Sequence, residues 1–183
     1  MCIRDRFYTS LYHAFIQPSL ASDVDGRYRT MGHEIKQDAS YTNYTVFSLW
    51  DTFRAAHPLY TIVTPEQNQA FIRSLLRKYD EGGILPKWEL ASNETGTMIG
   101  YHAVSVIADA MMKKQCDFDV KKALEACIRS SVYDTTGVTP MMDRQILNGK
   151  LMPVSIKYKN ELGYICLLYT SPSPETVLDL VCR

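Results

Sequence analysis

Apolar residues recur at helical spacing in several separate stretches of the chain, and the clearest follows Thr64. Within residues 65–79 these positions lie three or four apart and share one helical face: Phe71, Ile72, Leu75, Leu76 and Tyr79. Thr64 and Gln67 match the capping box that begins many helices. Gly82 and Gly83 come next, and glycine is the usual residue just after a helix. The pattern therefore predicts a helix over residues 65–79.

Four other stretches show the same spacing and complete the predicted set of helices. They cover residues 7–16, 46–53, 98–110 and 120–128. Pro18 and Pro58 follow the first two, and Asp119 is a suitable N-cap for the last. The stretches 22–43 and 85–97 are polar and irregular, and strands do not alternate with the helices. We therefore predict an all-α fold of paired helices, such as an α/α barrel or a solenoid, joined by long loops of the kind that usually carry function.

Composition and charge limit the function more than the fold. A length of 183 residues corresponds to one domain or to part of a larger one. Twenty Lys and Arg residues balance twenty Asp and Glu residues, so the chain lacks the cationic field that nucleic acids and anionic membranes require. No apolar run reaches the roughly 18 residues that span a bilayer. The opening MCIRDR shows no signal peptide.

The five cysteines do not form a metal-binding pattern. Only Cys116 and Cys127 lie within patterned sequence, and they are eleven residues apart. Neither belongs to a Cys-x-x-Cys pair or has a histidine at a ligand spacing. We therefore expect no zinc site and interpret both residues as buried apolar thiols.

Two carboxylates meet in the first of three polar stretches that could carry chemistry. Asp23 and Asp25 precede Gly26 in the sequence SDVDGRYR. Such a turn could bind a calcium ion through its oxygens or hold a sugar hydroxyl, although the later acidic residue of known calcium loops is missing. The simpler interpretation is an Asx-turn, in which the side chain accepts a hydrogen bond from the backbone two residues on.

The second stretch, residues 42–58, places an aromatic ring beside two charges. Trp50 lies on an apolar stripe, and Asp51 and Arg54 are three residues apart at its edge. A ring can cover the C–H groups of a sugar while a carboxylate and a guanidinium bind neighbouring hydroxyls. The simpler interpretation is that Asp51 and Arg54 form a surface ion pair of little energetic consequence.

The third stretch, residues 82–104, places Trp88, Glu89, Asn93 and Glu94 in one predicted loop. Two carboxylates near an aromatic ring are typical of glycoside hydrolysis, where an acid and a base flank the scissile bond. The alternative is that Glu94 decorates a helix N-terminus, where negative charge is favoured. His102 lies on an apolar stripe, which favours a core histidine whose hydrogen bonds are satisfied.

Longer blocks of this sequence resemble glycoside hydrolase family 92, the calcium-dependent, exo-acting α-mannosidases. The blocks occur in the order of the family: FYTSLYHAFIQPSLASDVDGRYR, YTNYTVFSLWDTFRAAHPL, GGILPKWELASNETGTMIGYHAVSVIADA and, more loosely, FDVKKALEA. The stretch YKNELGYI fits a linking segment of the family. The resemblance covers about residues 7–165, which we therefore interpret as a partial catalytic domain.

The resemblance implies a fold, a reaction and a setting. The fold is an incomplete (α/α)6-type barrel, which a β-sandwich domain normally precedes. The reaction is inverting hydrolysis of terminal α-linked mannose, often α-1,2, from a mannose-containing glycan. A calcium ion holds mannose hydroxyls and helps to distort the ring. Family members are typically exported, so the resemblance implies a periplasmic, cell-surface or secreted enzyme.

The chain departs from the family in one respect that bears on mechanism. In the family, the acid lies in a Glu-Gly-Asn block, the base in a Gly-Asn-Asp-Asp block, and a Gly-Asn-Glu-Pro block lies between them. None of these strings occurs in the 183 residues. We therefore expect an inactive fragment without most calcium ligands, carrying one wall of the mannose subsite: Asp25, Trp50, Asp51, Arg54, Trp88, Glu89, Asn93 and Glu94.

The two ends of the chain do not match the pattern of its middle. Residues 1–6 show no periodicity, and composition changes abruptly at residues 166–183. We interpret both as non-native ends, the alternative being flexible natural termini. A rival function also remains at this point, that of a non-catalytic helical module that binds sugar or serves a structural purpose.

Overall fold

The computed structural model describes residues 2–95 and 100–132. Its helices are α1 (Ile3–Ala14), α2 (Leu49–Thr52), α3 (Ala56–Val63), α4 (Pro65–Gly82), α5 (Ala103–Met112) and α6 (Val120–Val132). Its strands are β1 (Ser19–Leu20), β2 (Arg27–Arg29), β3 (Ile35–Gln37), β4 (Tyr44–Thr45), β5 (Phe47–Ser48), β6 (Trp88–Leu90) and β7 (Asn93–Glu94).

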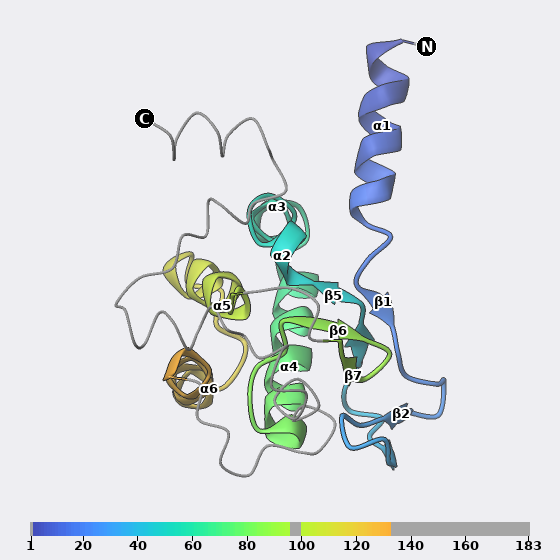
Figure 1. Ribbon diagram of the computed structural model, residues 1–183. Helices are drawn as coiled ribbons and strands as arrows, with labels where there is room; N and C mark the ends of the chain where they lie inside the picture. Colours follow the sequence, from blue (N-terminus) through green and yellow to red (C-terminus); the bar gives the residue numbers. More distant parts are fainter. Residues whose placement is uncertain (1, 96–99, 133–183) are drawn as a thin grey trace.

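The long helix α4 forms the centre of the described structure (Figure 1). Helices α3, α5 and α6 pack against α4, and α5 also packs against α3 and α6. The short strands lie on the other side of α4. The shared core consists mainly of aliphatic and aromatic side chains from these helices, from β5 and α2, and from the segment after α4: Phe47, Leu49, Tyr60, Phe71, Ile72, Leu75, Leu76, Tyr79, Leu85, Ala103, Val106, Ile107, Ala110, Ala123 and Ala126. The helical part of the predicted fold is therefore confirmed.

Helix α4 confirms the apolar stripe and the stop predicted from the sequence, but not its cap. All five apolar side chains of the stripe are buried. The helix ends at Gly83, whose φ of 93° is left-handed and whose N–H donates to the Tyr79 carbonyl over 2.7 Å. The Thr64 side chain makes no cap hydrogen bond. Thr64 is the single residue between α3 and α4, and its N–H donates to the Tyr60 carbonyl instead of to Gln67, as a capping box requires.

Three small antiparallel sheets make the all-α prediction incomplete. Strand β1 pairs with β4, β2 with β3, and β5, β6 and β7 form one sheet in that order. Most of these strands lie in the two stretches, 22–43 and 85–97, that the sequence marks as irregular loops. Strands of two or three residues are too short to show the alternation by which a strand is recognised.

The segment predicted as a helix over residues 46–53 is mostly something else. Val46 has a φ of 65°, β5 follows it, and α2 is a single turn. A further helix, α3, begins at Ala56 and includes Pro58. The prediction missed α3 because it took Pro58 as a stop, whereas proline is tolerated in a first helical turn.

The remaining helices agree better with the sequence. Helix α5 covers most of the predicted residues 98–110, of which 98 and 99 lie outside the described residues. The Asp119 carboxylate accepts a hydrogen bond from the Lys122 N–H over 3.0 Å, which confirms the predicted cap of α6. Helix α1 confirms the stretch 7–16 but begins at Ile3 and buries no residue. It extends away from the other helices (Figure 1).

The burial of the two cysteines within patterned sequence differs from the expectation. Cys116 is exposed and Cys127 is half-buried, so the buried-thiol interpretation is wrong for the first. Burial raises the pKa of Cys127 to about 11, which keeps it a neutral thiol.

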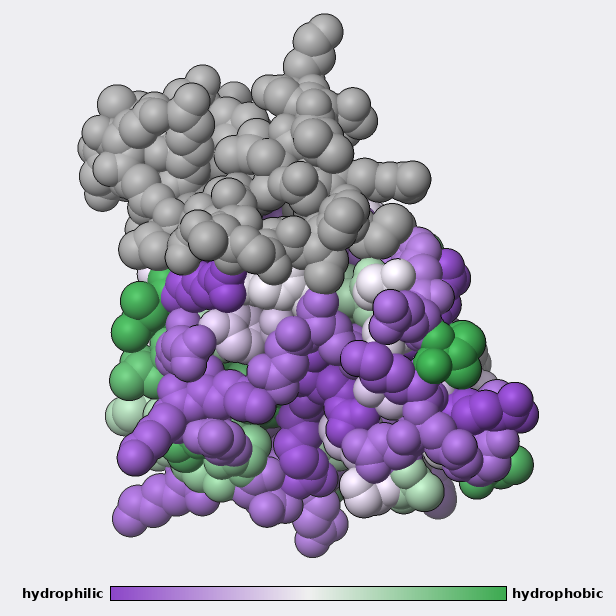
Figure 2. All heavy atoms as spheres, turned by 90° about the horizontal axis from the view of Figure 1, so that it is seen from below, coloured by the Kyte–Doolittle hydropathy of each residue, from purple (hydrophilic) through white to green (hydrophobic). Residues whose placement is uncertain are grey.

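Within the described residues, no helix combines the length and apolar character needed to cross a bilayer. On the face shown in Figure 2, hydrophilic residues dominate and hydrophobic residues form separate patches.

Candidate functional site

The sheet β5–β6–β7 brings two of the three polar stretches together. Ser48 of β5 pairs with Trp88 of β6, and Phe47 pairs with Glu89. On the other edge of β6, Glu89 pairs with Glu94 of β7. Because α2 begins at the residue after Ser48, the segment that carries Trp50, Asp51 and Arg54 lies next to the β6–β7 hairpin.

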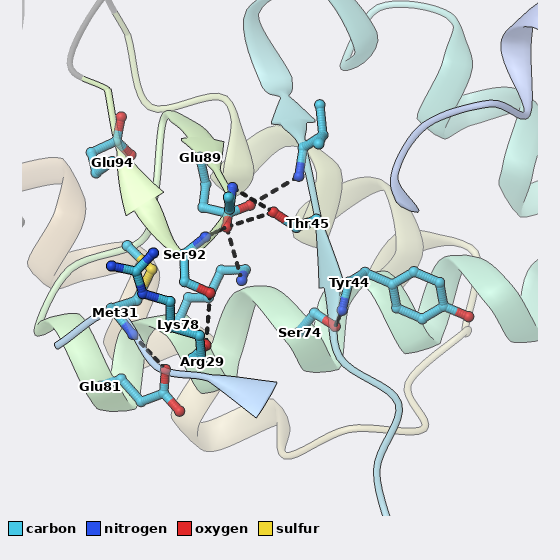
Figure 3. Close-up of polar contacts among 12 residues, drawn as sticks. Arg29, Met31, Tyr44, Thr45, Ser74, Lys78, Glu81, Glu89, Ser92 and Glu94 are labelled. Carbon is cyan, nitrogen blue, oxygen red and sulfur yellow. Dashed lines mark hydrogen bonds and ion pairs between the residues drawn. The ribbon is translucent and has the colours of Figure 1, made fainter. Parts of the chain in front are cut away.

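The side chain of Glu89, in β6, points to the buried face of this sheet and has no exposed surface. The backbone N–H groups of Val46 and Ser92 donate hydrogen bonds to its carboxylate over 3.1 and 2.6 Å, and the Thr45 hydroxyl donates another over 2.9 Å. The Lys78 ammonium of α4, only 1% exposed, lies 3.2 Å from the same carboxylate. Figure 3 shows these donors converging on Glu89 from three parts of the chain.

Three non-glycine residues around this carboxylate adopt left-handed backbone conformations. Ala91 and Ser92, the two residues of the hairpin turn, have φ values of 50° and 60°, and Val46 has 65°. A β-branched residue such as Val46 rarely adopts this conformation, and each such residue costs on the order of 1–3 kcal/mol. The Val46 and Ser92 N–H groups bind Glu89, so the carboxylate stabilises the strained backbone. Strain of this kind concentrates at functional sites.

Glu94 is also buried, at 4% exposure, and it serves the backbone of the same hairpin. Its carboxylate accepts hydrogen bonds from the N–H groups of Lys87 over 2.6 Å and Trp88 over 3.1 Å. It lies in β7, nine residues before α5 begins at Ala103, so the alternative that it decorates a helix N-terminus is wrong. Burial lowers the pKa of the Lys87 side chain, against an opposing effect from the Glu94 charge.

Trp88 is held at its backbone while its side chain is half-buried. Its N–H binds Glu94, and its carbonyl accepts hydrogen bonds from the Thr95 N–H over 3.1 Å and the Thr95 hydroxyl over 2.9 Å. Adjacent residues of a strand point to opposite faces. The Trp88 ring therefore lies on the face of the sheet opposite to Glu89. Asn93, the first residue of β7, is half-buried as well.

The Trp50 segment is organised around His102 instead of an ion pair. Trp50 is 6% exposed and meets the His102 ring edge-on, with 5.3 Å between centroids. Phe53 stacks on His102 at 4.2 Å, and the Arg54 guanidinium lies over Phe53 at 4.9 Å. Asp51 accepts a hydrogen bond from the Ser48 hydroxyl. Asp51 and Arg54 are both exposed but do not form the surface ion pair that their spacing suggests.

His102 is a core histidine, as expected, but its hydrogen bonds are not satisfied. The side chain is 5% exposed, and its buried Nε2 atom has no hydrogen-bond partner. The ring packs against Gly100, where an added Cβ would come within 2.6 Å of Nε2. Burial, with a smaller effect of the Arg54 charge, lowers the pKa of His102 to about 4. The imidazole is therefore neutral at ordinary pH.

Asp25 lies elsewhere, in the turn before β2. Its carboxylate accepts hydrogen bonds from the Arg27 N–H over 3.1 Å and from Arg27 Nε over 2.6 Å, which confirms the Asx-turn. The hydrogen bond from the Arg27 backbone is the largest cause of the lowered pKa of Asp25. Figure 1 shows β2 at the opposite end of the strands from α2. The structure thus brings seven of the eight candidates to one region and leaves Asp25 apart.

The described residues do not assemble a calcium site. Among residues 2–95 and 100–132, no group of three or more His, Cys, Asp or Glu side chains is placed to hold a metal ion. The Asp25 carboxylate is already bound by Arg27, and that of Glu89 by Lys78. The carboxylates of Asp25 and Glu89, two of the candidate oxygen ligands for calcium, are therefore already paired with protein cations.

Sequence reasoning missed Lys78, although the sequence holds a signal for it. Lys78 comes between Leu76 and Tyr79 and lies three residues after Leu75, within the apolar stripe of α4. A lysine at a buried position almost always has a counter-charge. The stripe therefore indicated a buried carboxylate partner, without saying which one.

Comparison with known proteins identifies the family to which this chain is similar. The profile of the glycosyl hydrolase family 92 catalytic domain matches residues 3–177. A family GH92 α-mannosidase of Bacteroides thetaiotaomicron is 45% identical, with a TM-score of 0.67. For the structure of that protein in complex with mannoimidazole, the sequence identity is 46% and the TM-score is 0.66. A family GH92 inverting mannosidase from the same organism is 30% identical, with a TM-score of 0.68. A search of curated proteins found no match.

These matches differ in how much of each chain they cover. They span 70%, 68% and 92% of this chain, in the order given. They span only 18%, 17% and 21% of the solved chains. This chain therefore corresponds to about a fifth of the length of those enzymes. Because the family profile covers nearly all of its residues, the chain belongs to glycosyl hydrolase family 92.

Proposed function

We propose that this chain is part of an exo-acting, inverting α-mannosidase that releases terminal α-linked mannose, often α-1,2, from glycans. The observation that carries the proposal is the 45% identity to a solved α-mannosidase over 70% of the chain. The complex of that α-mannosidase with mannoimidazole supports a mannose-containing partner. In this proposal the described helices form part of an α/α barrel, and the enzyme acts in the periplasm or outside the cell.

Four residues are best suited to meet the sugar within this proposal. Asp51 and Arg54 are exposed, and Trp88 and Asn93 are half-buried at the adjoining hairpin. The Trp88 ring can cover apolar C–H groups of the sugar. The Asp51 carboxylate accepts hydrogen bonds from hydroxyls, and the Arg54 guanidinium donates them. Trp50 is 6% exposed, and its placement suits it to support α2 more than to cover a sugar.

The four residues above do not include the catalytic acid and base. An inverting glycosidase needs a carboxylic acid and a carboxylate about 6.5–9.5 Å apart, with room for a water molecule between. Glu89 and Glu94 are buried and bound by the backbone or by Lys78. We propose that the acid, the base and most ligands of a calcium ion lie outside residues 2–95 and 100–132.

Replacing Trp88 tests this function in the full-length enzyme that carries the chain. We expect Trp88→Ala to raise KM for α-1,2-mannobiose about tenfold, near the upper end of the roughly 0.5–1.5 kcal/mol of an aromatic contact. Trp88→Phe keeps an aromatic face and should raise KM less. Met112→Ala, at an 84% exposed residue on α5, serves as a control and should leave KM unchanged.

Titration of the full-length protein with mannose, beside an assay of mannobiose cleavage, separates the rival functions. A sugar-binding module would change tryptophan fluorescence on titration with mannose but release no sugar from mannobiose. A purely structural module would lose stability with Trp88→Ala or Arg54→Ala and show no sugar affinity to lose. Either outcome in the full-length protein would contradict the proposal.

A further inference from the structure

The candidate carboxylates of the β6–β7 hairpin serve the protein and not the sugar, and Glu89 has a definable part in this. We propose that Glu89, held by Lys78, is a positioning residue that fixes the register of β6 and thereby sets the Trp88 ring on the sugar-facing side. This inference rests on the proposed mannosidase function and adds to it a division of labour within the hairpin.

Glu89 has no hydrogen-bonding capacity left for a ligand. A carboxylate accepts about four hydrogen bonds. Glu89 already receives four donors, from Thr45, Val46, Ser92 and Lys78, and none of its surface is exposed. A sugar hydroxyl could reach it only by displacing one of these donors from a dry site, where an unpaired group is costly.

The donors to Glu89 come from three separate parts of the chain. Val46 precedes the strand that leads into α2, Ser92 is in the turn of the hairpin, and Lys78 is on α4 (Figure 3). The α4 helix contributes nine buried residues, of which Ile72 and Leu75 are fully buried. Through Lys78, the carboxylate therefore ties the hairpin and the start of α2 to the centre of the core.

The register of the short strands needs a further constraint. Strand β5 pairs with β6 through only two residue pairs, Phe47 with Glu89 and Ser48 with Trp88. So few pairs specify register weakly, and a slip of one residue reverses every side chain of a strand. In a slipped strand, the Trp88 ring would point toward α4 and Glu89 toward the opposite face. A buried carboxylate paired with Lys78 makes that slip costly, because it would leave the ammonium buried without a counter-charge.

A double-mutant cycle in the full-length enzyme tests whether Glu89 acts through Trp88. We expect Glu89→Gln to raise KM for α-1,2-mannobiose about tenfold, as Trp88→Ala does, because both remove the same ring from the sugar. In the Trp88→Ala background, Glu89→Gln should then change KM less than about twofold. Fully multiplicative effects, about a hundredfold together, would overturn the inference, since they would mean that Glu89 contributes independently of Trp88.

A second variant separates positioning from simple loss of stability. Lys78→Met combined with Glu89→Gln removes both buried charges and avoids the lone ammonium that Glu89→Gln leaves. It also carries the test if Glu89→Gln fails to fold. We expect this pair to melt closer to wild type than Glu89→Gln while keeping the raised KM. A normal KM in the pair would overturn the inference, whereas a wild-type enzyme that releases no mannose would overturn the proposed function instead.

Discussion

The purified 183-residue chain is expected to release no detectable mannose from α-1,2-mannobiose, and the proposed full-length enzyme is expected to release it. Glycosidases accelerate very slow reactions, by factors of about 10⁶–10¹⁷ or more, and they do so with a paired acid and base. In this chain, Glu89 and Glu94 are bound by buried N–H groups or by Lys78. The Glu-Gly-Asn and Gly-Asn-Asp-Asp strings, which the family resemblance links with the acid and the base, do not occur in its sequence.

The measurement is a reducing-sugar assay at equal molar concentrations of the chain and of the full-length enzyme. A mixture of the two serves as a control for inhibitors in the preparation. Mannose release by the chain alone, above that of a Trp88→Ala chain prepared in the same way, would contradict the expectation. It would mean that residues of this chain supply a complete acid and base pair.

The exposed apolar surface of the described helices leads to a related expectation for the isolated chain. On α1, the exposed fractions of Ile3, Phe7 and Tyr12 are 88%, 60% and 69%. On α6, Leu124 and Ile128 are 57% and 55% exposed and lie on one face. Uncovered surface of this kind forfeits roughly 1.5–3 kcal/mol for each large side chain. We therefore expect the chain to aggregate or to be partly unfolded, and a monodisperse sample with one cooperative melt would contradict this.

The core of this fold could be predicted from its sequence because helical spacing is a strong local signal. The stripe of α4, the Asp119 cap and the Gly83 stop all follow from residues near in sequence. The strands could not be predicted, since β5, β6 and β7 are set by contacts far along the chain. Val46 shows the difference, because its left-handed backbone depends on a hydrogen bond to a carboxylate 43 residues away.

The candidate site shows the same division between local and distant information. Composition and family resemblance brought Trp88, Glu89 and Glu94 forward as a group, and the structure does place them together. The sequence could not tell which of them faces a ligand, because burial and partner are tertiary properties. Asp25 was grouped with the others by resemblance alone, and the structure assigns its carboxylate to Arg27.

Acid should loosen the packing of α3 against α4 in the full-length enzyme, because His57 is buried as a neutral group. Burial lowers its pKa from 6.5 to about 4, against a smaller opposing effect of its hydrogen bond with Asn68. Between these two values the unfolded chain binds more protons than the folded one, so stability rises with pH in that window. The stabilisation is complete above pH 6.5 and is lost as the pH falls toward 4.

The size of this effect follows from the same two pKa values. At pH 5 the loss is about 2 kcal/mol, equivalent to a roughly 30-fold rise in local opening. His102, with a pKa also lowered to about 4, adds an effect of the same sign. Part of its shift comes from the exposed Arg54 guanidinium, which water screens, so we expect the His102 contribution to be the smaller one.

Hydrogen–deuterium exchange of peptides from α3, at pH 7 and at pH 5 and corrected for intrinsic rates, measures this opening. We expect the protection of residues 56–63 to fall at pH 5 and the fall to be much smaller in His57→Gln, which keeps a polar side chain near Asn68 but does not titrate. Peptides from α6 provide an internal reference, since the described part of that helix contains no histidine. An equal loss of protection in the wild type and in His57→Gln would assign the acid sensitivity to other groups, because a side chain that cannot bind a proton cannot link folding to pH.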